Sequence, residues 1–232
     1  MKIIAIMETN ESKIYEEKYK NGYGHSYPES HIIRVYERFL KERIPLVPQP
    51  KILDYGCGTG ANLLFFKHKG FNTYGCDVSK TAIDICKNNK NFNKEQFTVC
   101  NEIPNLIDLF EGLSFDLILS NQTLYYLPDI PLRKFIDESY RLIKNGGLLV
   151  VTMMAKSHWF YSQSISNEGT MHTIDLTNSR FNQLSYINFK EKDELENLFH
   201  PFQKCLLGFY TLDILAEEGP SDHWIYIGQK ID

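Results

Sequence analysis

The chain has 232 residues, of which 43% are hydrophobic and 13% aromatic, and its formal net charge is -4. This length suits one domain with a sizeable core, and the acidic balance argues against a polyanionic partner such as nucleic acid. The five cysteines are odd in number and form no CxxC pair, which predicts reduced thiols and no metal site. They are Cys57, Cys76, Cys86, Cys100 and Cys205.

No stretch of the sequence has the pattern of a targeting signal or a membrane span. The start, MKIIAIMETNESK, has too short an apolar run for a secretory signal and lacks a small-residue cleavage site. No run approaches the roughly 18 apolar residues that a membrane-spanning helix needs. We therefore expect a cytoplasmic protein without membrane insertion.

The N-terminal segment, residues 1–47, mixes charged and aromatic side chains. The loop GYGHSYPES places Tyr23, His25 and Tyr27 ahead of SHIIRVYERFLKER, whose apolar residues have helical spacing. We expect this segment to form a helical lid over a site in the following part of the chain, with its tyrosines facing a ligand.

From residue 51 onward, short apolar runs alternate with helical patterns. Strands are predicted over residues 51–55, 72–78, 96–100, 115–120 and 148–154, and helices over 61–70, 81–89 and 131–144. Ser79 is a predicted N-cap, and Asn145-Gly146-Gly147 is predicted to end the third helix. Strands that are apolar on both faces, alternating with helices, predict a doubly wound α/β fold with helices on both faces of a mostly parallel sheet.

Residues 155–188 interrupt this alternation of predicted strands and helices. They are polar and aromatic without a clean period, which indicates an insertion after the fifth strand. The pattern resumes with a predicted helix over 190–200 and predicted strands over 203–212 and 223–230. Because the link between the last two strands is too short for a crossover helix, we expect an antiparallel pair at the sheet edge.

A glycine-rich loop joins the first predicted strand to the helix that follows it, in the stretch ILDYGCGTGANLLFF. Glycine is needed where the backbone turns tightly or where a ligand approaches it closely. Gly56, Gly58 and Gly60 lie where open α/β sheets bind nucleotides, outside the carboxyl ends of the strands. A plain strand-to-helix turn is the alternative interpretation.

Two aspartates beside this loop narrow the choice of ligand. Asp54 precedes the glycines, where a carboxylate would repel a pyrophosphate but not a cation. Asp77 ends the next strand, where an acidic side chain bonds ribose hydroxyls. The spacing DYGCGTG also differs from the GxGxxG of dinucleotide sites. The loop therefore favours one adenosine with positive charge, as in S-adenosylmethionine.

Over roughly residues 51–154 the sequence resembles the class I S-adenosylmethionine-dependent methyltransferases. The resemblance is carried by the glycine loop, by Asp77 in YGCDVS, by VCNEIP after the third strand, and by SNQTLYYLPD and LIKNGGLLVVTMM. It implies a Rossmann-like sheet of seven strands in the order 3-2-1-4-5-7-6, with strand seven antiparallel. That arrangement agrees with the edge pair predicted above.

The resemblance also implies the residues that bind S-adenosylmethionine. These are Tyr27, Asp54, Gly56, Gly58, Gly60, Asp77, Val78, Asn101, Glu102, Asn121, Gln122 and Tyr126. Asn101 stands at a position that often approaches the adenine, although many relatives carry aspartate there. The segment from Ser120 to Asp129 corresponds to the part that lies under the methionine end of the cofactor.

Several classes of methyltransferase have characteristic residues or motifs that this sequence lacks. SNQTLYYL does not contain the Asn/Asp-Pro-Pro-aromatic tetrad typical of amino-methylation of adenine or glutamine. Cys100 and Cys205 fall in predicted strands, which does not suit a cysteine nucleophile, and no carboxylate cluster for magnesium occurs near residues 120–145. We therefore expect metal-independent methylation of an oxygen or nitrogen atom in a small molecule.

The acceptor pocket is expected to come from the lid and the insertion 155–188. The insertion's candidates are His158, Trp159, Tyr161, His172 and Arg180. The candidates for a general base are His25, His158 and His172, because imidazole titrates near neutral pH.

If the acceptor were already an oxyanion, such as a phosphate oxygen, no base would be needed. Arg180 and tyrosines such as Tyr23 would then orient it. The remaining histidines are assigned surface or packing roles. They are His31, His68, His200 and His223.

Other functions stay open at this stage. The aromatic opening and the Asn- and Lys-rich composition also resemble bacterial capsule-modification methyltransferases, including enzymes for phosphoramidate groups. A non-catalytic S-adenosylmethionine-binding partner of a sister enzyme is compatible with the same motifs. A nicotinamide-dependent oxidoreductase is disfavoured by the glycine spacing and Asp54, and an RNA acceptor by the acidic balance. The oligomeric state is not predicted.

Overall fold

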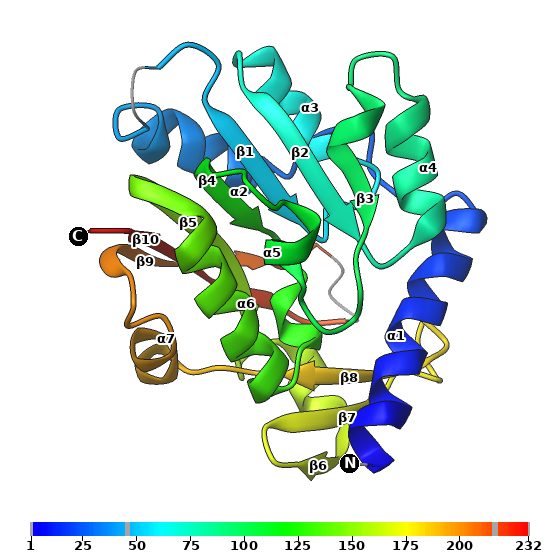
Figure 1. The fold of residues 1–232 in the computed structure, drawn as a ribbon. Coiled ribbons are helices and arrows are strands. Elements are labelled where there is room, and N and C mark those ends of the chain that lie inside the picture. Colours follow the sequence, from blue (N-terminus) through cyan, green and yellow to red (C-terminus); the bar gives the residue numbers. More distant parts are fainter. Residues whose placement is uncertain (1, 45–46, 215–217, 232) are drawn as a thin grey trace.

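A computed structural model describes residues 2–44, 47–214 and 218–231, with side chains from residue 11 onward. Within this part, seven strands form one sheet in the order β3-β2-β1-β4-β5-β10-β9 (Figure 1). The strands are β1 (Lys51–Tyr55), β2 (Asn72–Asp77), β3 (Phe97–Val99), β4 (Phe115–Ser120), β5 (Ile143–Met154), β9 (Gln203–Leu212) and β10 (Ser221–Gln229). When these seven strands are numbered 1 to 7 in chain order, their order in the sheet is the predicted 3-2-1-4-5-7-6. The last strand, β10, is antiparallel to both of its neighbours, which confirms the predicted edge pair.

Helices cover both faces of the sheet, as predicted. They are α1 (Lys2–Lys20), α2 (Ser30–Val35), α3 (Ala61–His68), α4 (Lys80–Asn88), α5 (Leu106–Leu109), α6 (Asp129–Leu142) and α7 (Lys192–Leu198). A π-helical turn, Tyr36–Leu40, continues α2. Buried side chains of α2, α3 and α4 pack on one face, and those of α5, α6 and α7 pack on the other. None of the helices in the described part combines the length and apolarity that crossing a bilayer would need.

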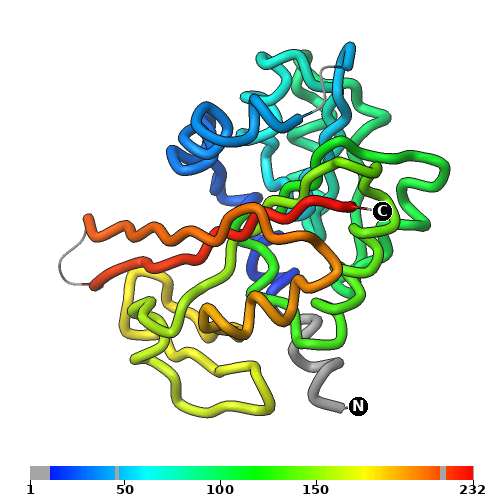
Figure 2. The backbone as a smooth tube through the Cα atoms, turned by 90° about the vertical axis from the view of Figure 1, so that its left-hand side faces the viewer, coloured from blue at the N-terminus to red at the C-terminus, as the bar shows by residue number. Residues whose placement is uncertain are grey.

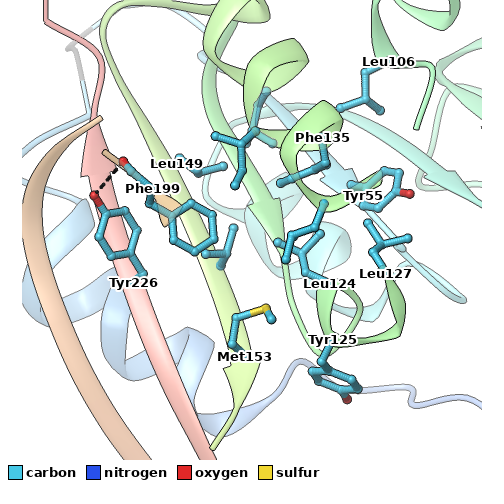
Figure 3. Close-up of a cluster of buried hydrophobic side chains, with 14 of the residues drawn as sticks. Tyr55, Leu106, Leu124, Tyr125, Leu127, Phe135, Leu149, Met153, Phe199 and Tyr226 are labelled. Carbon is cyan, nitrogen blue, oxygen red and sulfur yellow. Dashed lines mark hydrogen bonds between the residues drawn. The ribbon is translucent and has the colours of Figure 1, made fainter. Parts of the chain in front are cut away.

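The sheet has a hydrophobic core on each face, and alternate residues of a strand belong to one core or the other. In β1, Ile52 belongs to one core and Leu53 to the other, because successive side chains of a strand point to opposite faces. All six residues of β4 are buried, as expected for a strand covered on both sides. Figure 3 shows part of one core, where Phe135 of α6 lies beside Tyr55 and the Tyr226 hydroxyl donates to the Phe199 carbonyl at 3.3 Å.

The insertion after β5 is more regular than the sequence suggested. It contains a 3-10 turn, Trp159–Gln163, and a separate antiparallel sheet of β6 (Ser164–Glu168), β7 (Met171–Asp175) and β8 (Leu184–Asn188). Four of the five β6 residues are exposed, so this strand lacks the apolar alternation by which a strand is predicted.

The prediction that Asn145-Gly146-Gly147 ends a helix was wrong. Helix α6 ends at Leu142, and these three residues lie within β5. The Gly146 amide donates to the Lys230 carbonyl at 2.9 Å, and the Lys230 amide donates to the Gly147 carbonyl at 3.0 Å. The end of β10 therefore holds the glycines in the sheet.

Helix α1 lies in the segment 1–47 that we expected to form a helical lid, although the predicted helical pattern began only at Ser30. It contacts α4 at one end and β8 towards the other, and so runs beside the carboxyl ends of the strands (Figure 1). The β9–β10 hairpin extends beyond the other strands on the side of the insertion (Figure 2). These elements enclose the space in front of the glycine loop.

Candidate active site

A cavity of about 570 Å³ lies at the carboxyl ends of the central strands. Its walls come from the glycine loop, α1, the loop before α2, the segment after β4, the start of the insertion and the start of β10. A volume in this range is typical of pockets that enclose small ligands. The cavity is therefore the place where the predicted lid, loop and insertion meet.

The glycine loop is a tight turn, as predicted. Gly56, Gly58 and Gly60 have φ values of 78°, 52° and 81°, a region that side-chain-bearing residues rarely adopt. A Cβ on Gly56 would lie 2.2 Å from Thr123 Oγ1, and one on Gly58 would lie 2.6 Å from Tyr19 Oη. Both the turn and the close neighbours therefore require glycine.

Asp77 fixes this loop from the end of β2. Its Oδ2 accepts the Gly58 amide hydrogen and its Oδ1 accepts that of Ser79, each at 2.9 Å. Burial raises the pKa of Asp77, and these hydrogen bonds oppose the rise. Ser79 caps α4 as predicted, its hydroxyl accepting from the Ala82 amide. The Asp77 carboxylate lines the cavity beside the loop.

Asp54 is buried behind the loop, without a hydrogen-bond partner for either carboxyl oxygen. Burial, and then the charge of Asp77, raises its pKa well above the ordinary value. It is not among the side chains that line the cavity. Burial favours the uncharged form of Asp54, and the acceptors that fit the ribose hydroxyls of a cofactor are those of Asp77, in front of the loop.

Helix α1 forms a wall of the cavity over the loop. Glu16 accepts the hydroxyls of Ser79 and Thr81 at 2.7 Å each, and these bonds lower its pKa to about 2. The Ser12 hydroxyl donates to Glu102. Sequence reasoning missed this wall, although its residues recur at helical spacing. Its cavity-facing members are Glu11, Ser12, Tyr15 and Tyr19.

Two further contacts attach the other part of α1. The hydroxyls of Tyr15 and Tyr126 are 2.6 Å apart. Glu11 Oε1 accepts the Tyr186 amide hydrogen at 3.0 Å, whereas its Oε2 is buried and accepts no hydrogen bond of ordinary geometry. Burial raises the pKa of Glu11 to about 7. Glu11 thus links α1 to β8 at the wall of the cavity.

A polar network occupies the carboxyl ends of β4 and β5. His31 Nε2 lies 2.8 Å from Asn121 Oδ1, and the Thr152 hydroxyl lies 3.3 Å from the same oxygen. The Gln122 amide donates to Thr152 Oγ1 at 2.7 Å. His31 was assigned no functional role from sequence, yet its ring is buried in this network and stacks on Tyr210 at 4.1 Å.

Two more histidines lie next to this network, and both line the cavity. His158 uses both ring nitrogens: Nδ1 accepts the Phe160 amide hydrogen, and Nε2 bonds the Ser221 hydroxyl, each at 3.0 Å. Burial lowers the pKa of His158 to about 3. His223 was assigned only a packing or surface role from sequence, but its ring also stacks on Tyr210.

The structure brings together most of the residues predicted from sequence. Those that line the cavity are Tyr23, His25, Tyr27, Gly56, Gly58, Asp77, Val78, Glu102, Asn121, Gln122, Tyr126, His158 and Arg180. Tyr27 lies at the rim, since its ring is 82% exposed. Arg180 forms a two-pronged ion pair with Glu218. Their roles in binding and catalysis stay predictions.

Five predicted residues are not among the cavity's lining residues. They are Asp54, Gly60, Asn101, Tyr161 and His172. Gly60 caps α3 from behind the loop, and Asn101 is exposed. His172 lies on β7, where its Nδ1 is 3.0 Å from the Ser164 hydroxyl. The structure therefore does not bring His172 to the site where the other candidates for a base lie.

We also searched the described residues for side chains arranged to bind a metal ion. Among residues 2–44, 47–214 and 218–231, no three His, Cys, Asp or Glu side chains are grouped so that they could hold a metal ion. The carboxylates of the cavity thus lie apart from one another, in contacts with hydroxyls, amides and Arg180.

Comparison with known proteins shows the family to which this chain belongs. A family profile described as "Methyltransferase domain" matches residues 24–203. The phosphoethanolamine N-methyltransferase of Plasmodium falciparum is 26% identical over 135 residues, covering 58% of this chain and 50% of that enzyme. The ubiquinone biosynthesis O-methyltransferase of Pelagibacter ubique is 29% identical over 107 residues, covering 46% and 43%. The chain spans about half the length of these relatives.

Solved structures agree in fold. A SAM-dependent methyltransferase from Methanosarcina mazei superimposes with a TM-score of 0.67 at 20% identity, covering 84% of this chain and 97% of that one. The magnesium protoporphyrin IX methyltransferase of Synechocystis, solved with bound S-adenosylmethionine, gives 0.59 at 12% identity, covering 97% and 93%. The family match covers most of the chain and includes the glycine loop and Asp77. The chain therefore belongs to the class I S-adenosylmethionine-dependent methyltransferases.

Proposed function

We propose that the protein transfers a methyl group from S-adenosylmethionine to an oxygen or nitrogen atom of a small polar molecule, without a metal ion. The observation that supports this is the continuous cavity of about 570 Å³. One part of it is lined by the glycine loop and Asp77, and the other by aromatic and polar side chains of the insertion and β10. A cavity of this size admits a cofactor and a small acceptor.

Residues around the loop would hold the cofactor. Asp77 presents carboxylate oxygens for the ribose hydroxyls, Val78 offers an apolar surface for the adenine, and Tyr126 would lie under the methionine end. The negative charges of Asp77 and Glu102 suit a ligand with a positive sulfonium and ammonium. When bound, S-adenosylmethionine supplies a methyl group on a positive sulfur, which leaves as a neutral thioether. The chain's own task is to position the acceptor and exclude water.

Replacing Asp77 with alanine is expected to weaken S-adenosylmethionine binding by about 1–3 kcal/mol, because hydrogen bonds to a charged acceptor are lost. Isothermal titration of the cofactor measures this loss. The Asp108→Ala variant, at an exposed position of α5, is the matched control and should bind normally. Equal affinities for Asp77→Ala and the unmodified protein would remove the ribose assignment.

The charges of the cavity favour a neutral or cationic acceptor. Its described lining has five carboxylates against one guanidinium, and Glu218 already pairs with that guanidinium. The charged lining residues are Glu11, Glu29, Asp77, Glu102, Glu218 and Arg180. An anionic acceptor would therefore have to displace Glu218 from Arg180. A phosphoramidate or sugar group of a capsule pathway stays a prediction from sequence resemblance, with less support from Arg180 than the sequence suggested.

The acceptor class can be found by following labelled methyl groups. We expect label from S-adenosylmethionine to enter small molecules of a bacterial metabolite extract, but not added tRNA or protein. Defined probes should include catechol, 3,4-dihydroxybenzoate and phosphoethanolamine, because the relatives include both O- and N-methyltransferases by name. Reactions with EDTA test metal independence.

The control for this screen is the Asp77→Ala variant, which should lose transfer to every acceptor in proportion to its weaker cofactor binding. Binding of S-adenosylhomocysteine without transfer to any fraction would contradict the proposal and favour a non-catalytic partner protein. Stabilisation by NAD but not by S-adenosylhomocysteine in thermal melts would instead indicate an oxidoreductase.

A further inference from the structure

A buried histidine on β10 that lines the cavity has a ring nitrogen without a hydrogen-bond partner. His223 is 3% exposed and lines the cavity. Its Nδ1 lies 3.4 Å from the Ser221 carbonyl oxygen, whereas its Nε2 is buried with no hydrogen-bond partner. Because a carbonyl only accepts hydrogen bonds, Nδ1 carries the ring hydrogen. Nε2 therefore holds a lone pair that nothing in the described structure uses.

The His223 ring is held in place by one stacked ring and two inclined rings. It stacks on Tyr210 with an interplanar angle of 7° and a centroid distance of 5.2 Å, and Tyr210 in turn stacks on His31. The Tyr125 and His158 rings lie 5.8 Å and 5.2 Å away. These contacts fix the direction of Nε2, which is the condition for a precisely placed proton acceptor.

The groups facing His223 keep it neutral near pH 7. Burial is the main cause that lowers its pKa to about 4, and the nearby His31 adds to the lowering. The Ser221 carbonyl and the Asp222 carboxylate oppose it. An imidazole in this state offers its lone pair over the whole neutral range.

His158, the base candidate that the sequence placed in the same cavity, cannot act in this way. Its Nδ1 accepts a backbone amide hydrogen and its Nε2 donates to the Ser221 hydroxyl. The two histidines thus differ in the one property that matters for proton transfer, a free nitrogen. His158 shapes the turn that begins the insertion and holds the β10 strand next to it.

We infer that His223 Nε2 accepts the proton of a hydroxyl group on the acceptor, which makes the reaction an O-methylation; this inference rests on the function proposed above. The hydroxyl oxygen bonds to the methyl carbon as the carbon–sulfur bond breaks and its electron pair leaves on sulfur. The hydroxyl proton passes to Nε2, giving an imidazolium that returns the proton to water after the product leaves. His223 is then a catalytic residue.

A hydroxyl suits this nitrogen better than an amine does. Amines of ordinary basicity reach the site as ammonium ions, which must lose a proton before nitrogen can attack, and a neutral imidazole of low basicity removes it poorly. A hydroxyl arrives neutral, donates a hydrogen bond to Nε2, and gives up its proton only as the new bond forms. Tyr125, Met154 and Phe160 line the same part of the cavity, and their apolar surfaces fit an aromatic ring. The acceptor class is a hydroxylated aromatic compound.

The tautomer of His223 can be measured without any acceptor. In protein labelled with ¹⁵N-histidine and saturated with S-adenosylhomocysteine, we expect the His223 resonance to show a hydrogen on Nδ1 and none on Nε2 at pH 7. The His223→Gln variant assigns the resonance. A hydrogen on Nε2, or a doubly protonated ring at this pH, would overturn the inference whether or not the protein methylates a small molecule.

The effect of His223→Gln on kcat distinguishes proton transfer by His223 from a purely structural role. With catechol, His223→Gln should lower kcat at least about 100-fold, the usual scale of general-base catalysis, while the affinity for S-adenosylhomocysteine stays within about twofold. With 4-nitrocatechol, whose hydroxyl is largely ionised in mildly alkaline buffer, the loss should shrink to about tenfold or less, since no proton has to be removed. The exposed-loop variant His200→Gln should behave as the unmodified protein with both compounds.

Two results would overturn this part of the inference. Equal losses with catechol and 4-nitrocatechol would show that His223 only supports the fold of the site. Transfer to phosphoethanolamine but to neither phenol would show that the acceptor is an amine. If the unmodified protein methylates nothing in the screen, the proposed function has failed, and the tautomer measurement still decides the state of His223.

Discussion

The Gly56→Ala variant is expected to lose about 2–5 kcal/mol of unfolding free energy and to bind S-adenosylmethionine at least tenfold more weakly. Two effects add. A residue with a Cβ at φ +78° costs about 1–2 kcal/mol, and the new methyl group would meet Thr123 Oγ1 at 2.2 Å, where overpacking costs about 1–3 kcal/mol more. The Thr123 hydroxyl donates to the Asn121 carbonyl, so it cannot turn away without losing that bond. Urea unfolding and cofactor titration measure both losses.

Gly112→Ala is the matched control for this experiment. Gly112 has φ +71°, close to the value at Gly56, but a Cβ there would meet no atom within 4 Å. It should therefore lose only the backbone part, about 1 kcal/mol, and keep its cofactor affinity. Adding Thr123→Ala to Gly56→Ala should recover part of the stability. Equal losses in the two glycine variants would contradict the close approach of Thr123 to the loop.

Glu11 should make the stability of the protein fall as the pH rises. Its folded-state pKa is raised to about 7 by burial, against an ordinary value of 4.5, so the folded protein favours the protonated carboxyl. This contribution is fully present below pH 4.5 and is lost as the pH rises through 7. The attraction of Lys18 and the hydrogen bonds from Tyr186 and Ser185 are already contained in the shift. We expect Glu11→Gln to be more stable than the unmodified protein at pH 8, by at most about 3 kcal/mol.

Thermal melts of both proteins between pH 4 and pH 8 check this. The gap between their midpoints should be small at pH 4 and should open mainly between pH 5 and pH 7. Glu17→Gln serves as the control, because Glu17 is exposed on the same helix and pairs only with the exposed Lys20 in the described structure. A gap that stays constant over the whole range would show that Glu11 titrates at its ordinary pH.

Much of the fold could be predicted because its signals are local. The strand β4 is a continuous apolar run, the glycine loop directly follows β1, and the shortness of the link after β9 allows only an antiparallel pair. Asp77 could be predicted as a binding residue because its place at the end of β2 follows from the same alternation. Each of these features depends on residues that are near one another in the chain.

The walls of the cavity could not be predicted in this way, because they depend on partners far apart in sequence. Glu16 meets Ser79 and Thr81 across more than 60 residues, and Glu11 meets Tyr186 across 175. The roles of the histidines could not be predicted for a different reason. Whether a ring nitrogen of His158 or His223 is free depends on which backbone group each faces, and no residue pattern records that.

Helix α1 has a consequence for the exposure of a bound cofactor. It binds the N-terminus of α4 through Glu16, Glu102 through Ser12 and the segment after β4 through Tyr15, and its Tyr19 lies close to Gly58. These contacts surround the part of the cavity that would hold the adenosyl group. An adenosyl group bound against Gly58 would therefore lie beneath α1, which would separate it from solvent on that side.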